Sequence, residues 1–301
     1  MNNKRRLFST VLCVAALTAG LFVSGCGSDK AGGIGSVVSS VVDGGDEKAA
    51  AKLNTLIDAT NRFNSDNVSF AQFQAEGLAK LKGGFAEGAI TNQPHFDRLQ
   101  ADLEKAKKEG STFKEVDAER DNVLNILNEL VPVYKDLTAY DDSKAYMNDG
   151  GAKGKELAAK YVAAVEKFDA AYAKFNETLN KVNAEQSKKQ IEKLKKDGKK
   201  GYAAAMESTL RLTELVDKLE KAPQNADKAA VEKELSEIEA LLKSINNDRG
   251  QVLADRYNSV VGDVRQVLAD PSDSNLNNMI EGFNGYIDTY NSTTPDQFDA
   301  K

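Results

Sequence analysis

The feature that most constrains how this 301-residue chain folds is a run of apolar residues between positions 161 and 182. They follow one another at alternating intervals of four and three, which is typical of a helix that packs along a narrow apolar seam. A polar continuation predicts one helix over about 154–196, and a break near Asn183 or Ser187 is the alternative. At about 1.5 Å per residue this helix would span roughly 60 Å, which favours an elongated bundle. The seam consists of Tyr161, Val165, Phe168, Tyr172, Phe175, Leu179 and Val182.

Helical periodicity continues through most of the chain after residue 46, with Gly and Pro mainly between the periodic stretches. We therefore predict an all-α fold, an elongated bundle of seven to nine long antiparallel helices with a coiled-coil-like seam. We expect a single all-helical domain over 46–291 and a frayed polar tail over 292–301. The helices are expected at about 46–64, 69–81, 94–108, 113–140, 154–196, 200–221, 226–268 and 271–290.

Local signals mark several of the expected helix boundaries. Residues 82–84, Lys-Gly-Gly, predict the end of the second helix. Thr112 to Glu115 fits a capping box, and Asp270 precedes a proline at a helix start. Pro132 predicts either a kink or a new helix, and residues 246–250 predict a bend in the 226–268 helix.

The first 26 residues resemble a bacterial lipoprotein leader. Lys4, Arg5 and Arg6 precede a short apolar run, which ends in Val-Ser-Gly-Cys at residues 23–26. This resembles a lipobox, in which small residues precede a cysteine that receives the lipid. We predict a signal peptide over 1–25 and lipidation, with palmitate among the acyl chains, on Cys26. An ordinary signal peptide with a chance cysteine is the alternative.

A lipid on Cys26 would anchor the chain to a membrane, because two or three acyl chains bind stably. Residues 26–45, rich in Gly and Ser, are expected to form a flexible tether. We therefore predict a lipid-anchored protein of the bacterial cell envelope. In a Gram-negative host, Gly27 in place of Asp favours the outer membrane, facing the periplasm or the cell surface.

Composition argues against several functional classes. The 46 acidic residues outnumber the 40 basic ones, so we expect no nucleic-acid partner. One His and two Cys argue against a His-rich metal site or a cysteine cluster. The chain also lacks GxSxG and Walker-type motifs. We expect no catalytic residues, no metal and no cofactor.

Three stretches resemble the YiiG-like family of bacterial lipoproteins. Residues 53–64 resemble its opening "LNxYIxxxNxxx" helix, and 283–291 its closing "FNxxIxxYN". Residues 140–157 resemble its "YYxxKxYxxDxxxKGKxLH" region, and the similarity continues over 163–169. Asp141 and Ala158 depart from the usual pattern. The resemblance implies a helical envelope lipoprotein, and it transfers no catalytic residues.

The stretch around residues 140–157 also contains the candidate ligand or partner patch. Its carboxylates and Asn148 lie beside glycines, as in calcium loops, but the EF-hand spacing is missing, and turn formation explains the same residues. Its tyrosines and lysines add groups suited to recognition. The patch consists of Tyr140, Asp141, Asp142, Tyr146, Asp149, Lys153 and Lys155.

Two other features have both a functional and a plain interpretation. Seven lysines over 188–200 could contact anionic lipid, lipopolysaccharide or teichoic acid, or form the solvated end of a long helix. His95 follows Pro94, lacks the HxxE and HExxH spacings, and is expected to be a surface or capping residue.

Three functional hypotheses follow. The first is a non-enzymatic interaction or scaffolding module with an envelope protein or glycan partner. The second is a solute- or metal-binding lipoprotein with a site near residues 140–157. The third is a two-carboxylate cell-wall glycan enzyme, which requires two acids facing each other roughly 5–10 Å apart.

Overall fold

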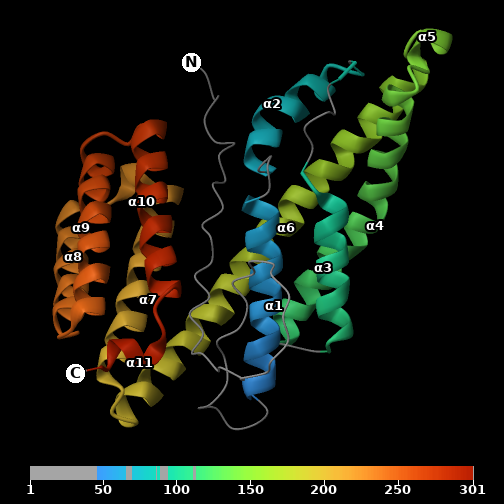
Figure 1. The fold of residues 1–301 in the computed structure, drawn as a ribbon. Coiled ribbons are helices and arrows are strands. Elements are labelled where there is room, and N and C mark those ends of the chain that lie inside the picture. Colours follow the sequence, from blue (N-terminus) through green and yellow to red (C-terminus); the bar gives the residue numbers. More distant parts are fainter. Residues whose placement is uncertain (1–45, 66–69, 86, 89–93, 111–112, 301) are drawn as a thin grey trace. The chain divides into compact units, whose positions relative to one another are not determined.

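The computed structural model describes residues 46–65, 70–85, 87–88, 94–110 and 113–300 (Figure 1). These residues form eleven α-helices and one 3-10 turn, with no strand among them, which confirms the all-α prediction. They group into two compact units, Lys52–Val182 and Asn183–Lys301, where one helical domain was expected. The predicted signal peptide, Cys26 and the tether lie outside the described residues.

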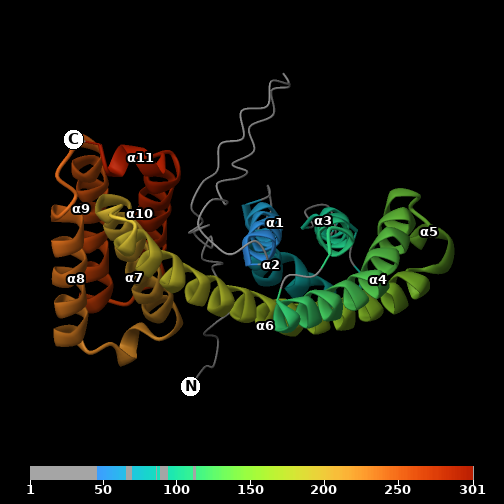
Figure 2. The ribbon, with the colours of Figure 1, turned by 90° about the horizontal axis from the view of Figure 1, so that it is seen from below.

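The first unit contains α1 (Asp46–Ser65) from Lys52 onward, α2 (Phe70–Lys82), α3 (Phe96–Lys108), α4 (Lys114–Asp142) and α5 (Tyr146–Asp149). It also includes the N-terminal part of α6 (Ala152–Lys196). The α6 helix runs through Asn183 and Ser187 without a break, as predicted. In both views α4 lies alongside the first part of α6, to which the short α5 joins it (Figures 1 and 2).

Aromatic rings from several helices form the centre of this unit. Every residue of the predicted seam is buried, with at most 2% of its surface exposed. The Phe168 ring on α6 lies 5.8 Å from Phe63 on α1 and 5.1 Å from Phe96 on α3. Both pairs meet edge to face, the arrangement that ring quadrupoles favour. The 4-3 spacing therefore predicted the core-facing side of α6 correctly.

Two of the predicted local signals fall on or next to α4, and Pro132 does not begin a new helix. The helix continues through Pro132, whose exposed position keeps its ring away from packed neighbours. The helix begins at Lys114 and its N-cap is Phe113, whereas Thr112 of the predicted capping box lies outside the described residues. Phe113 takes the extended backbone conformation that an N-cap needs, and its own side chain makes no capping hydrogen bond.

The second unit contains the last part of α6, followed by α7 (Lys200–Lys221), the 3-10 turn η1 (Pro223–Asn225) and α8 (Lys228–Lys243). It continues with α9 (Asp248–Ala269), α10 (Asp273–Asn291) and α11 (Pro295–Phe298). Each of α7 to α10 packs against the next, and α10 returns against α7. Short connections make these four helices alternate in direction around one core.

The single helix predicted over 226–268 is wrong. The chain reverses over 244–247, so α8 and α9 form a hairpin. The Asn247 side chain caps α9 by accepting hydrogen bonds from the backbone amides of Arg249 and Gly250. A Cβ on Gly250 would collide with the Ile245 backbone, so this position favours glycine. Similarly, α10 is capped by Ser272 and not by Asp270.

Ion pairs connect α8 to both of its neighbours. Arg211 on α7 donates to both carboxylate oxygens of Glu234, at 2.7 and 2.9 Å, and also to Glu237. Arg265 on α9 forms a second two-bond contact with Glu232. Such forked guanidinium contacts favour one alignment of the helices more strongly than isolated lysine pairs do.

The tail that was expected to fray instead packs against the second unit. Phe298 on α11 is buried and stacks on Tyr202 and Tyr290, with ring centres 6.0 Å apart in each case. Asn247 Nδ2 donates to the carbonyls of residues 297, 298 and 300 at 3.0–3.2 Å. The backbone amide of Gly201 donates to Asp299 Oδ1 at 2.6 Å. Burial of one aromatic ring therefore orders this segment.

We predict that Gly201→Ala destabilises the second unit by about 1–3 kcal/mol. The added Cβ would lie far inside contact distance of the Phe298 carbonyl, a backbone group that cannot rotate away. Gly262→Ala is the matched control, because its Cβ would meet nothing within 4 Å on the exposed face of α9. It should stabilise the helix by about 0.5–1 kcal/mol. Urea unfolding measures both, and equal effects of the two substitutions would contradict the prediction.

Candidate functional site

The α4–α6 connection brings together most of the predicted patch. Tyr140 donates its hydroxyl hydrogen to Asp149 Oδ1 at 2.6 Å. Asp149 also accepts from the backbone amides of Gly151 at 2.9 Å and Lys153 at 3.2 Å, and so satisfies the first turn of α6. The hydrogen bond from Tyr140 is the main reason that the pKa of Asp149 is lowered. Burial is the main reason that the pKa of Tyr140 is raised.

A small aromatic cluster supports this connection from the side. The ring of Phe85 lies 5.2 Å from Tyr140 and 5.6 Å from Tyr146. A Cβ on Gly154 would lie 2.6 Å from atoms of both the Phe85 and the Tyr140 rings, so glycine is needed here for the rings to approach α6. A hydrogen bond to Glu87 is the main reason that the pKa of Tyr146 is raised to about 12.

The structure places the predicted patch residues in two groups. Tyr140, Asp141, Tyr146 and Asp149 make internal contacts, and Asp141 accepts from the backbone amide of Gly88 at 3.0 Å. In this part of the family-like motif, these side chains therefore hold the α4–α6 connection together. The other three, Asp142, Lys153 and Lys155, have exposed side chains. Ligand binding by the patch stays a prediction.

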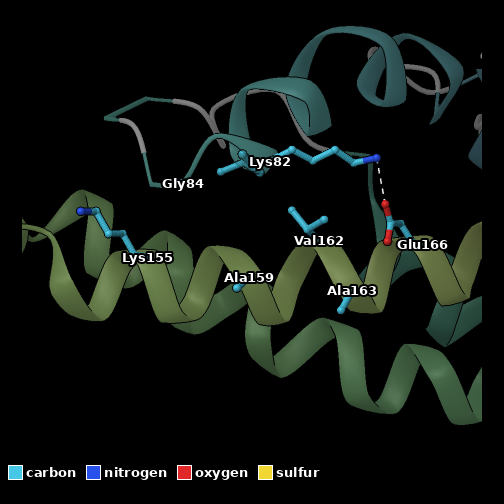
Figure 3. Close-up of a pocket in the computed structure, with 8 residues that line it drawn as sticks. Lys82, Gly84, Lys155, Ala159, Val162, Ala163 and Glu166 are labelled. Atoms are coloured by element: carbon cyan, nitrogen blue, oxygen red, sulfur yellow. Dashed lines mark ion pairs between the residues drawn. The ribbon is translucent and has the colours of Figure 1, made fainter.

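Beside this connection lies a groove of about 280 Å³ between the end of α2 and the outer side of α6. Figure 3 shows Lys155 at one end and Lys82 with Glu166 at the other. Lys82 Nζ lies 2.8 Å from Glu166 Oε1. The groove combines an apolar floor with charged groups at both ends. The residues between the ends include Ala159, Val162 and Ala163.

Local sequence explains the shape of the groove. The α2 helix ends at Lys82, as Gly83 and Gly84 predicted, and Gly84 has a left-handed φ of 111°. Alanines at 159 and 163 leave space beneath the departing chain. Of the groove residues, sequence reasoning singled out Lys155 and missed Lys82, Val162 and Glu166 as site residues. The small residues on the side of α6 opposite the seam were the available signal.

Asp58 on α1 is a titratable group that sequence reasoning overlooked. Its pKa is raised from 3.8 to about 6, mainly because burial disfavours the charged carboxylate, while Arg62 acts in the opposite direction. Perturbed carboxylates are enriched at functional sites, although packing also produces them. The available sequence signal was its position between two apolar residues, Ile57 and Ala59, which the structure shows to be buried.

The seven lysines near the end of α6 divide by their contacts. Lys188 pairs with Glu214, Lys195 with Glu192 and Glu207, and Lys199 with Asp296. Within the part of the chain that the structure describes, the other four have no such partner. These are Lys189, Lys193, Lys196 and Lys200.

His95 occupies the position predicted for it. It is exposed and is the N-cap residue of α3, where its side chain makes no capping hydrogen bond. Among the described residues, no three His, Cys, Asp or Glu side chains are grouped so that they could hold a metal ion. In the same residues, no helix is sufficiently long and apolar to cross a membrane.

The fold and these surfaces define an all-helical protein with two compact units. The chain belongs to DUF3829, a family of proteins of unknown function, whose family model matches residues 47–251. This match extends from α1 into the first turn of α9. No curated protein and no solved structure gives a significant match.

We predict that Asp58→Asn raises stability at pH 7 by about 1 kcal/mol. This is less than the pKa shift alone implies, because the side chain is partly exposed and water screens it. Since the folded-state pKa is the higher one, the wild-type protein should lose stability as pH rises from about 4 to 6. The variant should lose that slope in urea unfolding.

Asp136→Asn is the control for this experiment, because Asp136 is an exposed carboxylate on α4. It should change stability by less than about 0.5 kcal/mol at either pH. An unchanged pH slope in the Asp58 variant would show that this carboxyl does not titrate as described.

Proposed function

We propose that this DUF3829 protein is a lipid-anchored, non-enzymatic interaction module of the bacterial cell envelope. The basic start, the short apolar run and the Val-Ser-Gly-Cys sequence at residues 23–26 support the anchor. The resemblance to the YiiG-like lipoproteins supports the same location. The helical units would then be displayed at a membrane, where their surfaces meet other envelope components.

The groove beside α6 is the observation that carries the interaction role. Its floor is apolar, and a protein segment that covered it would remove Val162 and its neighbours from water. Lys155 has no ion-pair partner among the described residues and is available to an acidic group of that segment. The Lys82–Glu166 pair at the other end adds a polar rim, as protein interfaces commonly have. We infer that an envelope protein binds here through an acidic, partly apolar segment.

We predict that Cys26→Ser abolishes incorporation of radiolabelled palmitate and releases the protein from the membrane fraction, because the thioether cannot form. Cys13→Ser is the matched control, since it alters the other cysteine of the chain within the predicted leader. It should retain label and membrane association. Equal labelling of both variants would overturn the anchor.

A photo-crosslinking residue tests the groove in living cells. We predict that the residue at Ala159 captures a defined partner, whereas one at Ala240, an exposed position on α8, does not. Adding Lys155→Glu should lower the Ala159 yield about tenfold, because it places like charges together. Identical products from both positions, or a yield unaffected by Lys155→Glu, would exclude this groove as the binding surface.

A solute-binding role is the second candidate, and the same groove supports it. Its volume of about 280 Å³ is close to the lower end of the range for small-molecule sites, about 300–1,000 Å³. Thermal unfolding with small anions, sugars and peptidoglycan fragments tests it. A dose-dependent stabilisation that Lys155→Ala removes would favour solute binding. Stabilisation that survives the substitution would place the ligand elsewhere.

A further inference from the structure

Charge is unevenly distributed in the second unit. Residues 188–200 contain seven lysines and two acidic residues. The following hundred residues, 201–300, contain nine basic and eighteen acidic residues. The segment that joins α6 to α7 therefore carries a net positive charge, whereas the rest of the second unit carries a net negative charge. A unit with such separated charge orients itself in an electric field such as that of a charged surface.

Part of the positive charge at this junction is neutralised within the unit. Two of the lysines form ion pairs with carboxylates on α7. Lys188 Nζ lies 2.9 Å from Glu214 Oε1, and Lys195 Nζ lies 2.8 Å from Glu207 Oε2. Lys199 pairs with Asp296 on α11 at 3.0 Å. These three lysines are therefore explained by the packing of the unit.

Three of the remaining lysines form a stripe on α6, in which Lys189 and Lys196 are exposed and Lys193 is half-buried. Lys189, Lys193 and Lys196 follow one another at intervals of four and three, so they share one face of α6. The buried residues of this stretch, Ile191 and Leu194, belong to the core on another side of the helix. Lys200, the first residue of α7, adds a fourth lysine, which is exposed, just after the turn. The acidic residues of this stretch are Glu192, which pairs with Lys195, and Asp197 in the turn.

Stabilisation of the helix end does not account for the whole stripe. Lysines in the last turn of a helix interact favourably with its negative pole, and Lys193 and Lys196 are placed to do so. That effect falls off within one turn, whereas Lys189 lies about two turns before the end. Lys200 is in the first turn of α7, where the positive pole of that helix opposes a cation.

We infer that Lys189, Lys193, Lys196 and Lys200, the lysine stripe, dock onto the anionic phospholipid headgroups of a bilayer. Clusters of four or more lysines on a helix bind anionic membranes through just this kind of contact, each contributing about a fivefold gain in affinity. The negative remainder of the unit repels the same surface and so turns the positive end toward it. The inference rests on the proposed anchor to bring the chain to a membrane, but the contact itself needs no lipid on Cys26.

Vesicle co-sedimentation tests the stripe on the mature chain, residues 26–301, with Cys26→Ser so that no acyl group contributes. The vesicles contain equal parts phosphatidylglycerol and phosphatidylcholine, or phosphatidylcholine alone. We expect binding only to the first, weakening as salt is added. Combining Lys189→Gln, Lys193→Gln and Lys196→Gln should lower the partition coefficient about 100-fold.

The matched control removes the same charge elsewhere in the unit. Lys218→Gln, Lys228→Gln and Arg256→Gln replace three exposed cations that have no ion-pair partner among the described residues. This triple variant should bind within about twofold of the parent, because its altered residues lie outside the stripe. Circular dichroism and thermal unfolding confirm that both variants are folded.

Three results would overturn the inference. They are no binding of the parent chain to phosphatidylglycerol vesicles, equal losses in the two triple variants, and preferential binding to soluble polyphosphate over vesicles. None of them bears on the anchor, which palmitate labelling of Cys26 tests separately. If Cys26 took up no palmitate, binding of the Cys26→Ser chain to vesicles would still be evidence for the lysine stripe.

Discussion

Burial of the aromatic seam of α6 is the interaction on which the first unit depends. Phe168 contacts rings from α1 and α3, and Tyr172 continues the cluster with its ring 5.3 Å from Phe63. Burying one such ring contributes about 1.5–3 kcal/mol, and close packing makes each ring dependent on its neighbours. Because α6 supplies the largest share of these rings, its register determines where the other helices can pack. The Tyr172 hydroxyl also donates to Asn64 Oδ1 at 3.0 Å, which ties α1 to the same register.

The α4–α6 connection and the groove are consequences of that register. Gly154 allows Phe85 and Tyr140 to approach α6, and Asp149 satisfies the amides at the start of the helix. The residues that resemble a ligand-binding loop in sequence therefore stabilise a helix start. The groove forms on the opposite side of α6 from the seam, where small residues leave room below the end of α2. Lys155 is the one residue of the predicted patch that also lines this groove.

Periodicity predicted the helices well where one face was consistently apolar. The α7 helix begins and ends at the predicted residues, and α6 is continuous over its predicted length. The reversal between α8 and α9 was missed because apolar residues continue at helical spacing across it, from Leu242 to Leu253. Asn247 followed by Gly250 was the local signal of a new helix start. The packing of Phe298 had no local signal in the sequence. One partner, Tyr202, is far away along the chain, and the other, Tyr290, belongs to a different helix.

Helical class, the buried side of α6 and the concentration of lysines at the α6–α7 junction follow from residue spacing alone, because a helix places residues three and four apart on one face. Which polar groups pair with one another does not follow from spacing. The internal roles of Tyr140 and Asp149, the raised pKa of Asp58 and the separation of paired from unpaired lysines all depend on atoms from different elements. Burial and hydrogen bonding act over a few ångströms in space, and the distance along the chain does not predict which groups come that close.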